Sequence, residues 1–308
     1  MEKILSKMLL PIPPLSEQHR IVAKLEEVLP KVEEYGKAQD RLDTLNSALP
    51  EKLKASILQE AIEGRLVPQN PDDEPASKLL DRIAEEKAKL VKEKKIKADK
   101  NASRIYRSDD GHWMEHFADK HRTDVCIDDE IPYDIPNSWE LCRLQDVADL
   151  YSGNSISASE KTAKYTNVEG MDYIGTKDVA FDHNIFYSNG VRIPKRYIDN
   201  FRIAKNGKVL LCIEGGSAGR KIGILKKDVC FGNKLCCFDT FIDINKYLYY
   251  FLQSPTFKQV FNTNKNGIIG GVSINNLKTL ILPIPPKQEQ DRIVSKLKQI
   301  LPKLDTLK

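Results

Sequence analysis

Within the first 64 residues, apolar positions recur with a helical period. From Ile21 onward the apolar residues recur with the spacing 4, 3, 4, 3, and eight of the eleven such positions up to Ser56 are apolar. This spacing predicts a helix with a narrow apolar seam of the coiled-coil type, interrupted by Gln39 and Asn46. The seam residues are Ile21, Leu25, Val28, Val32, Tyr35, Leu42, Leu49 and Leu53.

Prolines and a glycine mark this helix. Pro13 and Pro14 suit its first turn, and Gly64 suits its end. Pro30 and Pro50 lie within it. They are expected to kink the helix or divide it, because proline removes a backbone donor and crowds the preceding turn.

The same segment returns near the other end of the chain. Residues 282–303, LPIPPKQEQDRIVSKLKQILPK, repeat residues 10–31, LPIPPLSEQHRIVAKLEEVLPK, with 15 of 22 positions identical. The second copy keeps the seam at Ile293, Leu297, Ile300 and Leu304. Two like helices that flank a globular insert can lie against each other and form its stalk.

The sequence between the two copies changes character twice. Residues 77–97, SKLLDRIAEEKAKLVKEKKIK, predict a second, basic helix. Residues 98–138 are polar and acidic with little periodicity, which is typical of a flexible connector. From Trp139 onward, short β-rich segments are bounded by turn signals, and residues 242–261 predict one amphipathic helix.

These elements predict an α+β protein, in which one mixed α/β domain is flanked by long helices that form coiled coils. The expected parts are a helical spacer with the basic helix at 1–104, an acidic linker at 105–134, the mixed domain at 135–282, and the start of a second spacer helix at 283–308.

Composition narrows the class of protein. The hydrophobic fraction of 41% and the charged fraction of 30% suit a water-soluble protein. No apolar run approaches the roughly 20 residues that a membrane helix needs. The six cysteines form no CxxC pair. We therefore expect reduced cysteines in a cytoplasmic protein, not a disulfide framework or a zinc knuckle.

Charge is spread unevenly. Residues 109–140 contain 2 basic and 10 acidic side chains, whereas residues 141–282 contain 19 and 12. An acidic block beside a basic one indicates a polyanion partner for part of the chain.

Two motifs resemble nucleotide or nuclease sites only superficially. EGGSAGRK (214–221) lacks the GxxxxGK[ST] order of a nucleotide-binding loop. It is either a hairpin turn or a turn whose amides, with Arg220 and Lys221, meet DNA phosphate. Asp72, Glu85 and Lys87 match a metal-nuclease pattern, but Glu85 and Lys87 fall in the charged helix predicted at 77–97.

Three histidines, His112, His116 and His121, have a spacing that could suit zinc, but no cysteine or fourth histidine lies among them. A polar linker is the preferred interpretation. The sequence therefore predicts no catalytic residue, no metal site and no cofactor of its own.

Basic residues gather in the predicted loops of the mixed domain, with tyrosines between them. One interpretation is a solvated surface. The other is a DNA-binding face, with Lys and Arg on phosphates and a few Arg, Asn or Ser side chains on base edges. The candidate DNA-binding residues are Ser155, Lys161, Lys164, Lys177, Arg192, Lys195, Arg196, Ser217, Arg220, Lys221, Asn233 and Lys234.

Three stretches resemble a known family. They are the repeated LPIPPLSEQHRIVAKL and LPIPPKQEQDRIVSKL, then SILQEAIEGRLVPQNPDDEPASKLLDRI (56–83), and IPNSWELCRLQDVADLYSG (135–153) with GKVLLCIEGGSAGRKIGIL (207–225). Together they resemble the specificity subunit of type I restriction–modification systems across essentially the whole chain.

The resemblance implies a non-catalytic subunit. Such a subunit has two target-recognition domains, each of which reads half of a split double-stranded DNA site and is followed by a helical spacer. The spacers pair as an antiparallel coiled coil. Methylation and cleavage belong to methyltransferase (modification) and restriction subunits, which bring S-adenosylmethionine, ATP and Mg²⁺.

This sequence has the order spacer, recognition domain and beginning of a second spacer, so it resembles half of a specificity subunit. The first spacer helix is longer than the second, which leaves apolar seam residues uncovered within one chain. We therefore expect a homodimer through the spacers, with methyltransferase subunits bound as well. A structural adaptor that holds methyltransferase subunits without reading DNA is the alternative. A methyltransferase–endonuclease fragment is disfavoured, because the sequence lacks the motifs of those enzymes.

Overall fold

One helix, α2 (Leu15–Ile62), carries the first copy of the repeat. The structure, a computed structural model, describes residues 11–99, 102–119, 121–265 and 270–306. The predicted division of this helix is wrong, because α2 continues through both Pro30 and Pro50. A proline removes one backbone hydrogen bond, and the turns on either side keep theirs. The helix ends before Gly64, as predicted, and the φ of +72° at Gly64 suits such an ending.

The chain forms two compact units. One comprises Met1–Leu53 with Leu304–Lys308, and the other comprises Lys54–Lys303. All strands within the described residues belong to the second unit.

Two four-stranded sheets form two layers of the second unit. The first pairs, in order, β10 (Ile222–Ile224), β9 (Val209–Cys212), β12 (Leu235–Thr240) and β5 (Ala148–Ser152). The second pairs β7 (Arg192–Ile193), β6 (Met171–Ile174), β11 (Val229–Phe231) and β8 (Ile203–Ala204). All neighbours are antiparallel except β6 and β11, which are parallel.

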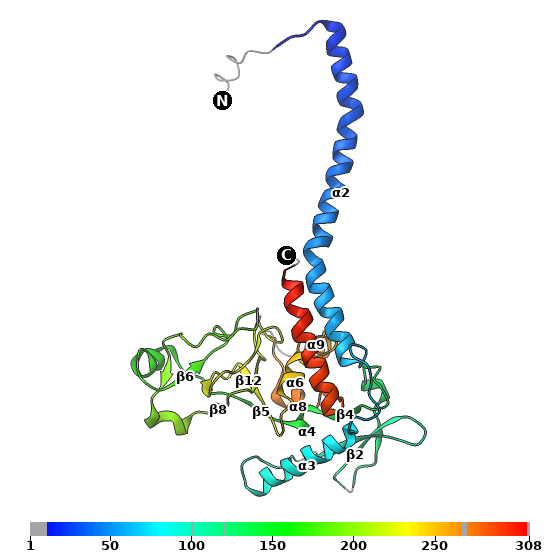
Figure 1. Cartoon of the computed structure of the whole chain (residues 1–308). Coiled ribbons are helices and arrows are strands. Elements are labelled where there is room, and N and C mark those ends of the chain that lie inside the picture. Colours follow the sequence, from blue (N-terminus) through cyan, green and yellow to red (C-terminus); the bar gives the residue numbers. More distant parts are fainter. Residues whose placement is uncertain (1–10, 100–101, 120, 266–269, 307–308) are drawn as a thin grey trace. The chain divides into compact units, whose positions relative to one another are not determined.

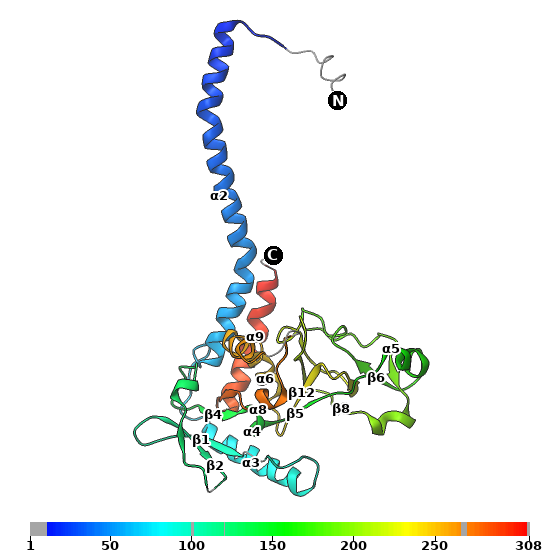
Figure 2. The same ribbon diagram turned by 180° about the vertical axis from the view of Figure 1, so that it is seen from behind.

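Helices form the third layer. They are α4 (Leu144–Val147), α6 (Asn245–Phe251), α7 (Pro255–Thr263), α8 (Ile274–Lys278) and α9 (Lys287–Asp305). In both views, α6, α8 and α9 lie on one side of β12 and β5, and β6 and β8 lie on the other (Figures 1 and 2).

The central strands β9 and β12 are buried on both faces, which explains their unbroken apolar runs VLLC and LCCF. Cys236 and Phe238 of β12 belong to the core shared with the helices. Leu235 and Cys237, which point the other way, belong to the core between the two sheets. Successive side chains of a strand point to opposite faces, so a strand covered on both sides must be apolar at every position.

The predicted single helix at 242–261 is two helices, α6 and α7. The Ser254 hydroxyl accepts a hydrogen bond from the Phe257 amide at 3.2 Å, and Pro255 occupies the first turn of α7. Serine at the N-cap and proline at the first helical position start a new helix, so the apolar periodicity continues across a real boundary.

The second copy of the repeat contains a strand and a helix. β13 (Ile281–Ile284) pairs in antiparallel fashion with β4 (Glu140–Arg143), and α9 follows it. The basic helix is α3 (Ala76–Lys92), whose buried residues Ala76, Leu79 and Ile83 lie in the same core as α9.

The predicted flexible connector is wrong for most of residues 103–126. There β1 (Ser103–Arg107), β2 (Trp113–Phe117) and β3 (Val125–Cys126) form a three-stranded antiparallel sheet. Ile105 and Ile127 pack against Leu141 and Ile281 of the β4–β13 pair. A 3-10 turn, η1 (Asp128–Glu130), follows the sheet. The α+β fold class itself is confirmed, with the mixed domain between helices.

Candidate nucleic-acid interface

The turn between β9 and β10 contains the glycine-rich EGGSAGRK segment. The Gly219 amide donates to the Cys212 carbonyl at 2.8 Å, and the Ala218 amide donates to the Gly215 carbonyl at 2.9 Å. Gly219 has a φ of +76°, and a Cβ there would lie 2.8 Å from a ring carbon of Phe261. Glycine is therefore required at this position, and the turn places Arg220 and Lys221 at its end.

Arg220 and Lys221 converge on Phe181, an aromatic residue of the neighbouring loop after β6. The Arg220 guanidinium carbon lies 5.1 Å from the ring centroid, and Lys221 Nζ lies 4.9 Å from it. Lys221 Nζ also donates to the Thr176 carbonyl at 3.0 Å, and Arg220 donates to the Gly216 carbonyl. Phe181 is 58% exposed. Two cations and an exposed aromatic face can meet phosphate and base at one place.

A second basic group surrounds Tyr197, in the 3-10 helix η3 (Lys195–Asn200). The Arg196 guanidinium carbon lies 4.9 Å from the Tyr197 ring centroid and Lys164 Nζ lies 5.9 Å from it. Lys164 belongs to η2 (Lys161–Tyr165), which continues α5 (Ala158–Glu160), and it forms an ion pair with Glu160 at 3.0 Å. The candidates Ser155, Lys161, Lys164, Lys195 and Arg196 are all exposed.

The remaining candidates lie apart from one another or serve local structure. Arg192 Nε lies 3.2 Å from Oδ1 of Asp172, a buried carboxylate that also pairs with Lys227. Lys234 pairs with Glu214 at 3.4 Å. Ser217 accepts the Arg220 amide at 3.0 Å with its carbonyl and so shapes the turn. Lys177 and Asn233 are exposed in loops.

Sequence reasoning noted the tyrosines among the basic residues but missed the exposed phenylalanines. Phe181 and Phe186 are large apolar residues that remain exposed in the loop between β6 and β7. Arg202 lies 5.7 Å from the Tyr151 ring centroid, and Lys227 lies 4.8 Å from that of Tyr187. A phenylalanine beside Asp182, His183 and Asn184, in a segment rich in turn-forming residues, was the available signal.

His183 lies in the Phe181 loop and is half-buried. Its Nδ1 has no hydrogen-bond partner, and its ring meets that of Tyr249 edge-on at 6.2 Å. Burial lowers the pKa of His183 to about 4, and the charges of Lys54 and Lys258 act in the same direction. The loop therefore packs on a neutral imidazole at neutral pH.

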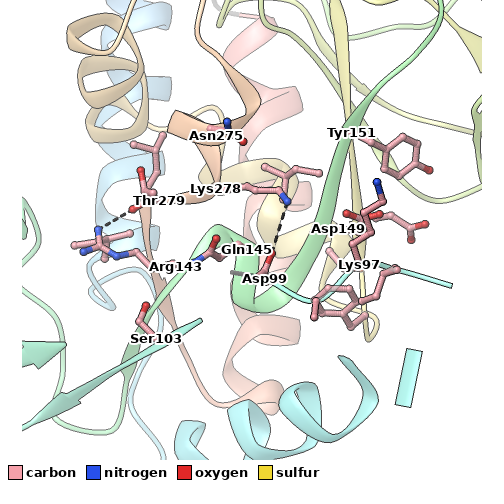
Figure 3. A pocket seen from close by; sticks show the side chains of 18 of the residues that line it. Lys97, Asp99, Ser103, Arg143, Gln145, Asp149, Tyr151, Asn275, Lys278 and Thr279 are labelled. Carbon is pink, nitrogen blue, oxygen red and sulfur yellow. Dashed lines mark hydrogen bonds and ion pairs between the residues drawn. The ribbon is translucent and has the colours of Figure 1, made fainter. Parts of the chain in front are cut away.

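A large cavity of about 1720 Å³ lies elsewhere in the second unit. Figure 3 shows Arg143 directed at the Thr279 carbonyl and Lys278 directed at Asp99, at 2.7 Å and 3.7 Å. Asp99 also pairs with Lys87 at 2.6 Å. Arg143, Lys278 and Asp99 are thus each engaged in local contacts, as in a structural cleft, and we assign the cavity no catalytic arrangement. In the same way, α3 places Glu85 and Lys87 on a helix and not at a strand edge.

Among the described residues, one group could offer three ligands to a metal ion: His112, Cys126 and Asp128, all exposed. Asp128 already accepts bonds from His112 Nδ1 at 2.6 Å and from the Trp113 amide at 2.7 Å. The hydrogen bond with His112 lowers the pKa of Asp128, and the same contact raises the pKa of His112. These contacts tie η1 to β2, so we assign the group a structural role.

The seam residues of the two helices have different surroundings. In α2, Ile21, Leu25, Val32, Tyr35, Leu42 and Leu49 are exposed, while Val28 and Leu53 are half-buried. In α9, Ile293 and Leu297 are fully buried, and Ile300 and Leu304 are half-buried. Every helix in the described part of the chain is too short or too polar to cross a membrane.

Comparisons with known proteins agree with this organisation. A family model described as "Type I restriction modification DNA specificity domain" matches residues 136–308. The chain is 28% identical to the type I restriction enzyme EcoAI specificity subunit of Escherichia coli, over 97% of this chain and 54% of that protein. It is 30% identical to the EcoEI specificity subunit of the same organism, over 81% of this chain and 39% of that protein. The chain thus spans about half the length of these relatives, or less.

A solved structure shows the same fold. It comes from a study of complex assembly and conformational transition in the type I R-M system, and it superposes with a TM-score of 0.50 at 19% identity. The match covers 97% of this chain and 55% of the other. Because the family model matches more than half of its residues, the chain belongs to the family of type I restriction modification DNA specificity domains.

Proposed function

We propose that this chain is a non-catalytic DNA-recognition module. Its mixed domain, residues 135–282, reads one half of a split double-stranded site. The observation that carries this proposal is the convergence of Arg220 and Lys221 on the exposed ring of Phe181. The cations bind backbone phosphate, and Phe181 with nearby polar loop residues contacts bases.

The charge distribution supports this location for DNA. The exposed basic residues lie on loops of the sheet that contains β6 and β11 and on the adjoining β9–β10 turn. Strands β2 and β3 of the small sheet lie in the acidic segment at 109–140, which repels a polyanion. DNA is therefore directed to one part of the unit.

The helices serve assembly. The apolar side chains exposed along α2 are suited to bury against other helices, either in a second copy of the chain or in methyltransferase subunits. We propose a homodimer through the helical spacers, with methyltransferase and restriction subunits joined to it. Those partners supply S-adenosylmethionine, ATP and Mg²⁺. Because its target is DNA, we propose that the complex acts in the cytoplasm, where the six cysteines would stay reduced.

The same exposed apolar residues also favour a second candidate function, a structural adaptor that binds methyltransferase subunits without reading DNA. A measurement of DNA binding by the chain distinguishes the adaptor from the recognition module. The adaptor binds duplex DNA no better than a neutral control protein, whereas the recognition module binds it with a steep salt dependence.

The test is a titration of the purified full chain against fluorescent duplex DNA at several salt concentrations. Replacing Arg220→Ala with Lys221→Ala should weaken binding and reduce the slope of log K against log salt by about 0.9 per lost phosphate contact. The matched control is Lys31→Ala with Lys37→Ala, two exposed lysines of α2. If the Arg220 and Lys221 pair behaves like this control, the β9–β10 segment is only a turn.

The DNA sequence that the chain recognises can be determined by an experiment in cells. Methylome sequencing of cells that express the chain with its methyltransferase partner should show a methylated split motif. Two like half-sites are expected if two copies of the chain form the complex.

A further inference from the structure

Strand β5 forms a free edge of the first sheet. The order β10, β9, β12 and β5 places β5 last, so that in the described part of the chain it pairs with β12 alone. The Val147 carbonyl accepts a hydrogen bond from the Phe241 amide at 3.0 Å, which continues this pairing by one residue. Because the main-chain groups of successive strand residues point to opposite edges, those of Ala148, Leu150 and Ser152 point away from β12.

The hydrogen bonds on the far side of β12 give the same direction. The Ile213 amide donates to the Lys234 carbonyl at 2.9 Å, which directs every second residue from Lys234 to β9 and leaves Asp239 facing β5. Among the residues that the structure describes, the main-chain groups of Leu150 and Ser152 therefore meet no hydrogen-bond partner. An unpaired edge of this kind can pair with another extended chain.

This edge borders the cavity of about 1720 Å³ described above, which Asp149, Leu150 and Tyr151 help to line (Figure 3). The Leu150 side chain is 3% exposed and belongs to the core shared with the helices, so its main chain is the part that meets the cavity. Sites for small molecules have volumes of roughly 300–1,000 Å³, so this larger space suits a stretch of polymer. We call it the β5 cleft.

Another part of the wall of the β5 cleft comes from the sheet formed by β1, β2 and β3. Phe117, Arg122 and Val125 contribute to it. The Arg122 guanidinium carbon lies 3.4 Å from the Phe117 ring centroid, and Val125 is 46% exposed. A chain lying along β5 would therefore also meet cationic and apolar side chains.

The uncompensated charge of the β5 cleft is mainly positive. Within the described residues, three exposed cations of its lining have no ion-pair partner: Lys97, Arg122 and Arg202. Most of its carboxylates are paired: Asp99 with Lys87 and Lys278, Glu115 and Glu130 with Arg143, Asp239 with Lys208, and Glu86 with Lys89. Asp149 has no such ion pair there, and burial raises its pKa. The charge that is left suits an acidic ligand.

The two faces of β5 differ, and this difference sets the pattern of the ligand. Leu150 points to the core shared with the helices, where Phe241 also lines the cleft. Tyr151 points the other way, and the Arg202 guanidinium carbon lies 5.7 Å from its ring centroid. Cross-strand neighbours share a face, so an added strand would place apolar residues beside Leu150 and acidic residues towards Arg202.

We propose that the β5 cleft binds an extended acidic segment of another protein, which adds as a strand beside β5. Main-chain hydrogen bonds to Leu150 and Ser152 hold the segment, and its alternating apolar and acidic residues give the specificity. The cations Lys97, Arg122 and Arg202 meet its carboxylates. This interaction goes beyond DNA recognition, and it uses none of the candidate DNA-binding residues.

The first test is a peptide array probed with the purified full chain. One set of eight-residue peptides alternates Asp or Glu with Val, Leu or Phe, and the matched set has Lys or Arg in place of the acidic residues. Peptides of the acidic set should be retained and those of the basic set should not. Equal retention of the two sets, or no retention of the acidic set, overturns the proposal.

The second test separates strand addition from attraction by charge alone. The strongest acidic peptide is made in two N-methylated forms, one methylated at odd positions and the other at even positions. Only every second amide of an added strand faces β5, so one form should bind at least about tenfold more weakly and the other like the parent peptide. Fluorescence anisotropy measures both. Equal affinities of the two forms overturn strand addition.

The third test changes the protein. Arg122→Glu with Arg202→Glu should weaken binding of the acidic peptide at least about tenfold, because charged contacts are lost and charge is reversed. Lys89→Glu with Lys92→Glu, two exposed lysines of α3 outside the lining of the cleft, is the matched control and should bind like the parent. Melting temperatures equal to that of the parent show that both variants are folded. Equal binding by the two variants overturns the proposal.

Nucleic acid is the competing occupant of the β5 cleft. Displacement of the acidic peptide by single-stranded DNA would assign the cleft to nucleic acid and overturn the proposal. The peptide assays themselves contain no DNA, so their failure leaves the proposed DNA recognition intact. Conversely, a chain that binds the peptide but no duplex DNA would refute the proposed function and leave the β5 cleft as a protein-binding site.

Discussion

Arg143 donates two hydrogen bonds to Glu115, from Nη2 to Oε2 at 2.6 Å and from Nε to Oε1 at 3.1 Å, and both side chains are buried. Arg143 Nη1 also reaches Glu130 at 2.9 Å. Burial by itself would raise the pKa of Glu115, but the bonds from Arg143 and Ser103 outweigh it, so its pKa lies below the usual value. The pair fixes β2 of the small sheet to β4 of the recognition domain.

Arg143→Ala should therefore lower the free energy of unfolding by about 3–5 kcal/mol, because it leaves the Glu115 carboxylate buried without a partner. Urea denaturation followed by tryptophan fluorescence measures the change. The control is Arg104→Ala, which removes an exposed ion pair to Asp81 at 2.9 Å and should cost less than about 1 kcal/mol. Equal effects of the two substitutions would contradict the role given to the buried pair.

The pH dependence of stability should change when His183 is replaced. Its folded pKa of about 4 lies below its ordinary value of 6.5, so the folded state binds fewer protons than the unfolded state between these values. His183 therefore lowers stability as the pH falls from about 6.5 to about 4. Asparagine tolerates the positive φ of 70° found there and does not titrate, so His183→Asn should lose less stability over this range. Parallel stability curves for the two proteins would show that His183 does not titrate as described.

Phe181→Ala should weaken DNA binding without changing its salt dependence. Phenylalanine neutralises no phosphate, so the slope of log K against log salt should stay constant while the binding free energy weakens by up to about 1.5–3 kcal/mol, the range for burial of a large apolar side chain. Anisotropy titrations with duplex DNA give both quantities. Ser188→Ala, an exposed change in the same loop, is the control. A reduced slope for Phe181→Ala would instead mean that the ring acts only by holding Arg220 and Lys221 in place.

The chain alone should be a dimer. Leu42 and Leu49 are 50% and 46% exposed along α2, and burial of such a side chain is worth roughly 1.5–3 kcal/mol. Leu49→Asp with Leu53→Asp should shift the dimer towards monomer in light scattering. Thr44→Asp with Ser47→Asp adds the same charge off the seam and should leave the dimer intact. A parent chain that stays monomeric at tens of micromolar would rule out this assembly.

The purified chain should have no methyltransferase, nuclease or ATPase turnover. Asp99 at the cavity pairs with Lys87 and Lys278, and the sequence contains no nucleotide-binding motif. Activity assays with S-adenosylmethionine, ATP and Mg²⁺ test this. Turnover that accompanies the chain through purification to homogeneity, and that is lost on its unfolding, would contradict the prediction.

The sequence predicted those secondary-structure elements that are determined by residues close together in the chain. The unbroken apolar runs of β9 and β12 report burial on both faces, and the spacing from Ile21 reports a helix. The three-stranded sheet at 103–126 was missed because its anchors join residues far apart in the sequence, such as the Glu115–Arg143 ion pair and the packing of Ile105 on Leu141 and Ile281. The boundary between α6 and α7 was missed because the apolar periodicity hides a serine–proline helix start.

The candidate interface was predictable only in part. Charge and glycine content pointed to Arg220 and Lys221, since a turn rich in glycine exposes the residues at its end. Phe181 was missed because a phenylalanine in a sequence is normally assigned to the core, and its exposure is known only from the fold. The role of Arg192 could not be predicted either. It donates a hydrogen bond to buried Asp172, 20 positions away in the sequence, so its charge is not free on the surface.

The two faces of β9 and β12 belong to separate cores, one shared with the helices and the other with the outer sheet. Loops of the outer sheet can therefore change length and sequence while the helix side keeps its packing. Under the proposed function, mutation or recombination in the outer layer alone would be enough to give the chain a new DNA target. The core on the helix side, which includes Ile293 and Leu297 of α9, would be inherited unchanged.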